Sequence, residues 1–351
     1  MLKRPINQAV DRKKKIIKHS RKQRIIGLIV AIFILLCICC LSLMIGAKPL
    51  SLNTVWDALF SPTDSYDHTI VQETRLPRTL LALAVGPAFG LAGALIQALT
   101  RNPLADPGIL GVNAGASFAV AIGVGLFSIT SMSGYIWLAF AGALIVTIGV
   151  YIISGGAGKT SPTPVQITLA GVALGAALSG ITTALTLMNS RAFASMLNWT
   201  VGSLAKRGTD DLWLILPFLI VGILLTLAIA RPLNAISFGD DRALSLGVNV
   251  NIVRIISLIA ITLLAGGATA IAGPIGFIGL MVPHCVRWFV GPDQPWIFLY
   301  SLAVAPGLLI LSDIIGRIVM FPSEIPVGII TGFVGAPILL ILVRRKKASG
   351  L

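Results

Sequence analysis

The first apolar segment of the chain reads Ile25-Ile-Gly-Leu-Ile-Val-Ala-Ile-Phe-Ile-Leu-Leu36, and its apolar character continues to Ala47. About 20 such residues are enough for a helix to cross the hydrocarbon core of a bilayer. The strands of a membrane barrel would alternate polar and apolar residues, and this run does not. Because lipid offers no hydrogen-bonding partners, the backbone of such a segment must be satisfied within its own helix. The segment therefore predicts a membrane-spanning helix.

Segments of this kind recur along the whole chain. Apolar residues make up 56% of the 351 residues, charged residues make up only 11%, and the mean hydropathy is +0.93. These values exclude an ordinary soluble domain and predict an all-α fold, a polytopic bundle of about ten transmembrane helices. The predicted spans are 25–47, 79–99, 109–128, 134–154, 167–187, 212–230, 254–273, 276–290, 296–316 and 326–343.

The charged residues predict how this bundle lies in the membrane. Ten of the 27 lysines and arginines fall in residues 1–24, a basic tail that we expect to lie in the cytoplasm against anionic lipid rather than on nucleic acid. With both termini cytoplasmic, 20 Lys and Arg residues fall on the inner side and seven on the outer side, as the positive-inside rule requires. The chain then consists of the tail 1–24 and a transmembrane domain, 25–347, with a large cytoplasmic loop at 231–253.

The chain lacks the parts of a self-powered pump. No charged residue lies near the middle of a predicted span, where ion-driven transporters commonly place a carboxylate or histidine relay. The stretch Gly155–Thr160 resembles the end of a phosphate-binding loop, but position 153 is Ile where that motif needs Gly, and prolines follow. The four cysteines have no His or acidic residue at ligand spacing. We expect no catalytic residue, metal site or cofactor here, so any energy must come from a separate protein.

A weakly polar stripe runs along the fifth predicted span. Its members lie within about 60° of one another at 100° per residue, and the opposite face of the span is aliphatic. Such an uncharged stripe can line a water-accessible path that guides a polar solute without trapping it. Alternatively, its hydroxyls bond to the backbone of their own helix or join neighbouring helices. The stripe consists of Thr168, Gly175, Ser179, Thr182 and Thr186.

The loop 231–253 contains the signals of a short helix. Ser237 and Asp240 have the spacing of a capping box, acidic residues suit the positive end of a helix, and Gly247 can terminate it. Two leucines then remain for an apolar partner, which favours a docking helix for a cytoplasmic protein over a plain surface loop. The residues assigned to this contact are Asp240, Asp241, Arg242, Leu244, Leu246 and Gly247.

Charged side chains also mark the outer edge of the bundle. Arg75 and Arg78 come just before the second span, where they can bind lipid phosphates or present paired donors to carboxylates of an external protein. Asp313 and Arg317 lie one helical turn apart near the outer end of the ninth span and predict an ion pair.

Several motifs then occur in one order along the chain. They are Arg75-Leu-Pro-Arg78-Thr, Gly90-Leu-Ala-Gly93-Ala-Leu-Ile-Gln97, Arg101-Asn-Pro-Leu-Ala-Asp-Pro107-Gly-Ile-Leu-Gly111, Gly273-Pro-Ile-Gly-Phe-Ile-Gly-Leu-Met-Val-Pro-His284, Asp313-Ile-Ile-Gly-Arg317 and Gly335-Ala-Pro337. This series resembles the iron-siderophore and vitamin B12 permease family of ABC importers. The resemblance implies a type II ABC importer permease in the bacterial cytoplasmic membrane. It also implies a second permease subunit, either a paralogue or an identical copy, two cytoplasmic ATPases that bind ATP and Mg, and an external substrate-binding protein.

The resemblance also implies roles for particular residues. Arg75, Arg78 and Arg317 become candidates for binding acidic residues of the external protein, and 238–249 becomes the coupling segment that contacts the ATPase. The fifth span becomes the path lining, with an inner gate at Thr163, Pro164 and Gln166. At that gate the cobalamin permeases of the family carry Ser and Thr where this chain has Pro162 and Pro164.

The amino-acid sequence of the segment 101–117 is more similar to that of the ferric-catecholate siderophore permeases than to that of the cobalamin permeases. Ferric catecholates are anionic, and Arg191, Lys206 and Arg207 in the outer loop could attract such a solute or could be solvated loop charges. The leading prediction is thus a permease for a ferric siderophore. Cobalamin or haem as the substrate, and a self-sufficient secondary transporter, remain as alternatives.

Overall fold

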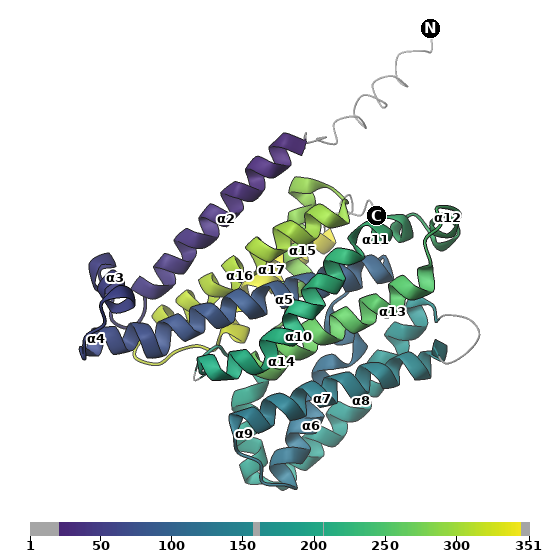
Figure 1. The fold of residues 1–351 in the computed structure, drawn as a ribbon. Coiled ribbons are helices and arrows are strands. Elements are labelled where there is room, and N and C mark those ends of the chain that lie inside the picture. The colour runs from purple at the N-terminus through teal and green to yellow at the C-terminus, as the bar shows by residue number, and fades with distance from the viewer. Residues whose placement is uncertain (1–20, 157–161, 206, 345–351) are drawn as a thin grey trace.

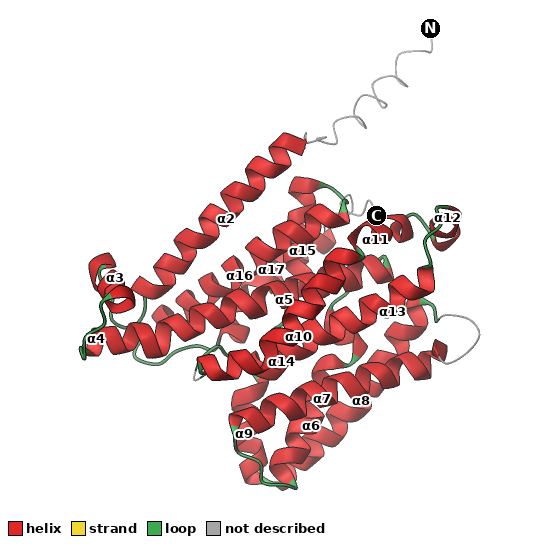
Figure 2. Cartoon of the chain, viewed as in Figure 1, coloured by secondary structure: helices red, strands yellow, loops and turns green. Residues whose placement is uncertain are grey.

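A computed structural model describes residues 21–156, 162–205 and 207–344, and the regular elements in these ranges are helical (Figures 1 and 2). Seven segments of it are long and apolar enough to cross a membrane. They are α2 (Arg21–Met44); α4 (Tyr66–Thr69), η1 (Ile70–Arg75) and α5 (Leu76–Thr100), which run on without a break; α7 (Met132–Tyr151) with η3 (Ile152–Gly156); α8 (Pro164–Met188); α10 (Thr209–Ala228); α13 (Val250–Ile261), η4 (Thr262–Gly266) and α14 (Gly267–Ala272), again continuous; and α16 (Gln294–Val319).

Three shorter apolar helices complete the set: α6 (Val112–Gly125), α15 (Ile278–Val290) and α17 (Val327–Arg344). Each of the ten predicted spans coincides with one of these long or short helices. The predicted all-α membrane bundle is therefore confirmed. The tail residues 1–20, the end of the predicted domain at 345–347 and most of the stretch Gly155–Thr160 lie outside the described residues.

The main differences from the predicted layout lie between the spans. Helix α2 already begins at Arg21, so the last residues of the predicted tail are helical. Segments expected as loops form short helices because they carry their own caps or amphipathic faces; for example, the Ser51 hydroxyl accepts a hydrogen bond from the Thr54 amide at the start of α3. These elements are α3 (Leu52–Phe60), η2 (Pro107–Leu110), α9 (Ser190–Thr200) and α11 (Ala230–Ser237). The short helix predicted within the loop 231–253 is present as α12 (Asp240–Ser245).

Helix α5 forms the centre of the bundle, with α16, α15, α10 and α13 packed around it (Figure 1). Glycines on α5 make this close packing possible, because helices in lipid associate through backbone contact rather than through a hydrophobic drive. A Cβ atom built at Gly93 would lie 1.8 Å from the Gly279 carbonyl oxygen, and one at Gly86 would lie 2.5 Å from the Pro306 Cα atom. No atom lies within 4 Å of a Cβ built at Gly276, so that glycine does not serve helix packing.

The remaining spans flank this centre on two sides. Helix α2 packs mainly on α16, while α6, α7 and α8 form a second group across the bundle (Figure 1). Within that group Gly115 and Gly142 bring α6 and α7 together, and a Cβ at Gly171 of α8 would lie 1.9 Å from the Ile109 carbonyl oxygen.

The two ends of the bundle carry different elements (Figure 1). Helices α3, α4 and α9 lie at one end, which we call the α9 end, and α11 and α12 lie at the opposite end, the α12 end. The residues predicted to be outside and those predicted to be inside thus fall on opposite ends.

Candidate transport sites

A buried arginine cluster holds the α9 end of the bundle together. Arg317 donates from Nε to Asp313 Oδ2 at 2.8 Å and from Nη1 to the Ser42 carbonyl oxygen at 2.9 Å. Arg78 donates from Nη1 and Nη2 to the two carboxylate oxygens of Glu324, at 3.1 and 2.6 Å, and its Nη2 lies 3.8 Å from Asp313 Oδ1. The predicted pair of Asp313 and Arg317 is confirmed. The two parallel bonds between Arg78 and Glu324 form a bidentate pair, which fixes geometry as well as charge.

Arg75 belongs to the same cluster but points to the end of α2. Its Nη1 donates to the carbonyl oxygens of Leu43 and Met44 at 2.7 and 2.8 Å, and its Nη2 donates to the Lys48 carbonyl oxygen. The first two contacts satisfy carbonyl groups that the last turn of α2 leaves without an intrahelical partner, and the third holds the segment that follows the helix. Arg75 and Arg317 are both buried, so their donors serve the joining of α2 to α5 and α16. Their contact with an external protein stays a prediction.

Glu324 is the member of the cluster that sequence reasoning missed. The Arg78 guanidinium, through its hydrogen bonds and its charge, holds the pKa of the Glu324 carboxyl below its usual range, against the opposing effect of burial. The sequence did offer one signal for Glu324. It is the single acidic residue of the predicted outer loop between the ninth and tenth spans, and so a candidate partner for the arginines at that end. Three arginines face two carboxylates here, which leaves the cluster cationic.

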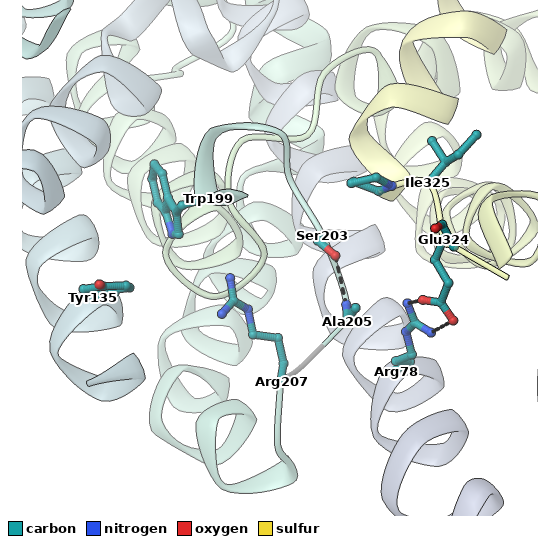
Figure 3. A pocket seen from close by; sticks show the side chains of 10 residues that line it. Arg78, Tyr135, Trp199, Ser203, Ala205, Arg207, Glu324 and Ile325 are labelled. Atoms are coloured by element: carbon teal, nitrogen blue, oxygen red, sulfur yellow. Dashed lines mark hydrogen bonds and ion pairs between the residues drawn. The ribbon is translucent and has the colours of Figure 1, made fainter. Parts of the chain in front are cut away.

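A cavity of about 660 Å³ opens beside this cluster at the α9 end (Figure 3). Arg78 and Glu324 line one side of it, and Tyr135, Trp199 and Arg207 line the other. Arg207 is the one cation of the predicted outer loop whose side chain is described, since Lys206 and the side chain of Arg191 lie outside the described residues. Burial lowers the pKa of Arg207, and the nearby Asp211 opposes that shift in part.

Helix α12 forms an exposed turn at the opposite end. Gly247 ends the helix, as predicted. Its φ is +78°, and the Val248 amide donates back to the Ala243 carbonyl oxygen at 3.0 Å. The predicted capping box is wrong. The Ser237 hydroxyl ends α11 by donating to the Asn234 carbonyl oxygen, and Gly239 at φ +113° then starts α12 without a side-chain cap.

Long-range ion pairs hold this turn in place. Asp240 pairs with Arg101, at the end of α5, and with Arg254 of α13, whose Nη2 lies 2.7 Å from Asp240 Oδ2. Leu244 and Leu246 are 59% and 69% exposed, and Asp241 and Arg242 are exposed as well. The turn is therefore a platform, held by ion pairs to α5 and α13, that presents two exposed leucines, as predicted from their position.

The predicted path residues on α8 divide into two kinds. The hydroxyls of Thr168, Thr182 and Thr186 donate to the carbonyl oxygens four residues earlier in their own helix, at 2.9, 2.8 and 3.0 Å. Bonding to the backbone of their own helix is the alternative to the path role that the sequence left open. Gly175 and Ser179, however, line an open cavity of about 350 Å³ between α8 and α6. The path assignment stays a prediction, and these two residues support it best.

The predicted gate residues form the start of α8. The Thr163 hydroxyl accepts from the Gln166 amide at 3.3 Å, the Gln166 side-chain oxygen accepts from the Thr163 amide at 2.8 Å, and Pro164 occupies the first turn. This capping box gives all three residues a structural role at the α12 end, and their role as a gate remains a prediction.

A helical bundle with seven long and three shorter apolar segments, cavities at its α9 end and along α8, and an exposed platform at its other end is typical of a membrane transport subunit. The chain belongs to the FecCD transport family, whose family model matches residues 34–345.

Named relatives agree with this assignment. The ferric enterobactin transport system permease protein FepD of Escherichia coli (strain K12) is 48% identical over 311 residues, which cover 88% of this chain and 92% of that protein. The Fe(3+)-citrate import system permease protein YfmD of Bacillus subtilis (strain 168) is 37% identical over 330 residues, covering 94% and 98%. A solved metal-chelate type ABC transporter in an inward-facing conformation matches with a TM-score of 0.80 at 26% identity, over 91% of this chain and 98% of that one. Both named relatives are permease proteins of transport systems.

Proposed function

We propose that this chain is the membrane-spanning permease subunit of an ATP-driven ABC importer that carries a ferric siderophore, of the catecholate type, into the bacterial cytoplasm. The observation that carries the proposal is the 48% identity, over nearly the whole chain, to a ferric enterobactin permease. The chain supplies the path through the bilayer, and a separate ATPase hydrolyses ATP with its own Mg.

The α12 end is the cytoplasmic end in this proposal. Two ATPase subunits, one for each permease subunit, would bind there and contact Leu244 and Leu246. The ion pairs from Asp240 to Arg101 and Arg254 support this role, because they connect the exposed turn directly to α5 and α13. A movement of the ATPase would thus reach the centre of the bundle. Helix α2 begins near the same end (Figure 1), which is consistent with the proposal that the basic residues before it belong to the cytoplasmic side.

Helix α8 supports the presence of a second permease subunit, either an identical copy or a paralogue. Only 17% of its most apolar 18-residue window is buried within this chain. Gly175 and Ser179 line the open cavity between α8 and α6, and a second subunit facing α8 would close this cavity into a path. The α9 end then receives an extracytoplasmic siderophore-binding protein, with Arg78 as the arginine of the predicted set that also lines a cavity.

Reconstitution into proteoliposomes tests the function. We expect ATP-dependent accumulation of a ferric catecholate when the permease, its ATPases and the binding protein are all present, and none with the permease alone. Cobalamin and haem, offered in parallel, should not accumulate. Uptake by the permease alone would instead identify a secondary transporter, and uptake of cobalamin or haem would overturn the substrate assignment.

The coupling platform has its own test. Replacing both leucines (L244D and L246D) should detach the ATPases during co-purification while the permease remains folded, because neither side chain is buried. The control is L52D at the opposite end, where the leucine is 57% exposed. Intact co-purification of the ATPases with the double variant would contradict the coupling role.

A further inference from the structure

A groove of about 400 Å³ runs between α2 and the neighbouring helices α15 and α16. The Tyr300 side chain of α16 lines it, and the Tyr300 hydroxyl donates to the Arg24 carbonyl oxygen at 2.7 Å, so α2 is held against the groove. Gly27 permits this approach, because a Cβ atom at that position would collide with the Tyr300 hydroxyl. The groove therefore lies between apolar helices of the membrane bundle, where the surrounding molecules are lipids.

The walls of the groove are apolar, and their length matches one leaflet of a bilayer. The wall on α2 runs from Gln23 to Ile34, which is eleven steps along the helix or about 16 Å. Half of a hydrocarbon core that is about 30 Å thick measures about 15 Å. The groove thus matches an extended acyl chain in character and in length. The apolar side chains of the two walls include Val30, Ala31 and Ile34 of α2, Val286 and Phe289 of α15, and Val304 of α16.

One end of the groove is cationic. Arg24 lines this end, and Arg21 and Lys22 lie exposed in the same first turn of α2. Asp293 is the carboxylate that pairs with Arg24, at 3.1 Å from Nη1, and it also accepts from the Asn234 side-chain amide at 2.8 Å. The Arg24 side chain is 21% exposed, and its Nη2 forms no hydrogen bond in the described part of the chain. Three cations beside one paired carboxylate therefore make this end attractive to an anion.

Two tryptophans indicate the depth of the cationic end in the membrane. The Arg24 guanidinium carbon lies 5.9 Å from the centre of the Trp296 ring, and Trp288 near the end of α15 is 49% exposed. Tryptophan side chains are enriched at the level of the lipid headgroups. Asp293, through Asn234 of α11, also connects this region to the α12 end (Figure 1). The cationic end thus lies at headgroup level on that side of the bundle, and the apolar walls lie at the level of the acyl chains.

From the shape, the charge and the depth of the groove we infer that it binds an anionic phospholipid of the leaflet at the α12 end. The phosphate lies at Arg24, near Arg21 and Lys22, and one acyl chain lies between α2 and the helices α15 and α16. Within this chain, 11% of the most apolar window of α2 is buried. The lipid therefore adds to the contact between α2 and the bundle, whichever substrate the protein transports.

The test measures lipid binding to the full chain, purified in detergent and depleted of lipid. Native mass spectrometry counts the bound molecules of palmitoyl-oleoyl phosphatidylglycerol, and zwitterionic phosphatidylethanolamine with the same acyl chains is the comparison. We expect one phosphatidylglycerol to bind per chain, with a Kd about tenfold or more below that of phosphatidylethanolamine. R24Q should raise the phosphatidylglycerol Kd about fivefold or more, whereas R24K, which keeps the charge, should raise it less. The control K48Q removes an exposed cation that pairs with Asp67 and should leave this Kd within about twofold of wild type.

A second pair of variants tests the walls. The double variant V30W and I34W places two large side chains in the groove and should abolish the tight binding of phosphatidylglycerol. The matched control is the double variant I29W and L36W, whose positions are 61% and 59% exposed and lie on the opposite face of α2. It should bind phosphatidylglycerol like the wild type. Added phosphatidylglycerol should also raise the midpoint of thermal unfolding of the wild type and of the control, but not of the variant with the filled groove, and the same melting curves show that each variant is folded.

Three results would overturn the inference. Equal affinity of the wild type for the two lipids would mean that the groove contacts bulk lipid only. Unchanged phosphatidylglycerol binding by R24Q, or by the variant with the filled groove, would place the bound lipid elsewhere. Tight binding that arises only after deletion of residues 1–20 would mean that the chain's own N-terminal segment occupies the groove.

Discussion

Helices α5 and α8 are both 25 residues long and both are apolar enough to cross a membrane, yet they occupy opposite environments. In the continuous segment that ends with α5, 83% of the most apolar window is buried, against 17% for α8. The difference lies in their contacts rather than in their length or polarity. Glycines of α5 meet other backbones directly, whereas most of α8 faces outward. Hydropathy therefore identifies a span but does not show whether protein or lipid surrounds it.

The largest expected effect comes from adding one methyl group to each helix. G93A should prevent correct folding, because the new Cβ would overlap the Gly279 backbone and neither backbone can give way without separating the two helices. G180A in α8 should leave folding intact, since no atom lies within 4 Å of its Cβ position. Thermal unfolding in detergent, together with the yield of monodisperse protein, measures both variants. Similar losses of stability in G93A and G180A would contradict the conclusion that α5 is closely packed and α8 is not.

The next effect concerns how the two helices are anchored at their first turns. Helix α8 starts with its own capping box, whereas α5 starts within the arginine cluster. D313N should destabilise the chain by about 3–5 kcal/mol, because it leaves Arg317 and Arg78 buried without that carboxylate. D67N provides the control, since its pair with Lys48 is exposed and should contribute about 1 kcal/mol at most. An equal shift in midpoint temperature for the two variants would show that the cluster does not anchor α5.

The smallest effect is a dependence on pH at the same anchor. Because Arg78 lowers the pKa of Glu324 in the folded chain, this pair stabilises the fold above the unfolded-state pKa and loses that effect as the pH falls through the lowered value. The side chain of Glu324 is 39% exposed, so solvent screening limits the contribution to about 1 kcal/mol or less. We expect wild type and E324Q to differ in midpoint temperature at neutral pH and to converge in acid. A constant difference across that range would contradict this account.

The spans could be predicted because each depends on about 20 consecutive residues. In lipid such an apolar segment can satisfy its backbone hydrogen bonds by itself only as a helix. The long-range contacts could not be predicted in this way. Arg78 and Glu324 are 246 positions apart, and Asp240 is 139 positions from Arg101, so no spacing rule joins them.

Local rules also failed where two of them competed. Ser237 could cap the start of α12 or end α11, and the positive φ of Gly239 decided in favour of the second. For the threonines of α8, spacing left two roles open: their hydroxyls bond within the helix, and their role in lining a path stays a prediction. The exposure of Leu244 and Leu246 was predictable, since a short helix between spans has only one side to bury.

The position of α2 has a consequence for how the protein is made. This helix leaves the ribosome well before its partner α16, because the Tyr300 hydroxyl that donates to its Arg24 carbonyl oxygen is synthesised 276 residues later. Arg317, which binds its Ser42 carbonyl oxygen, follows later still. During translation α2 must therefore wait in the bilayer without α16, and as the most apolar of the seven long spans it is suited to do so. Its contacts with α16 can therefore form only late in the synthesis of the membrane domain.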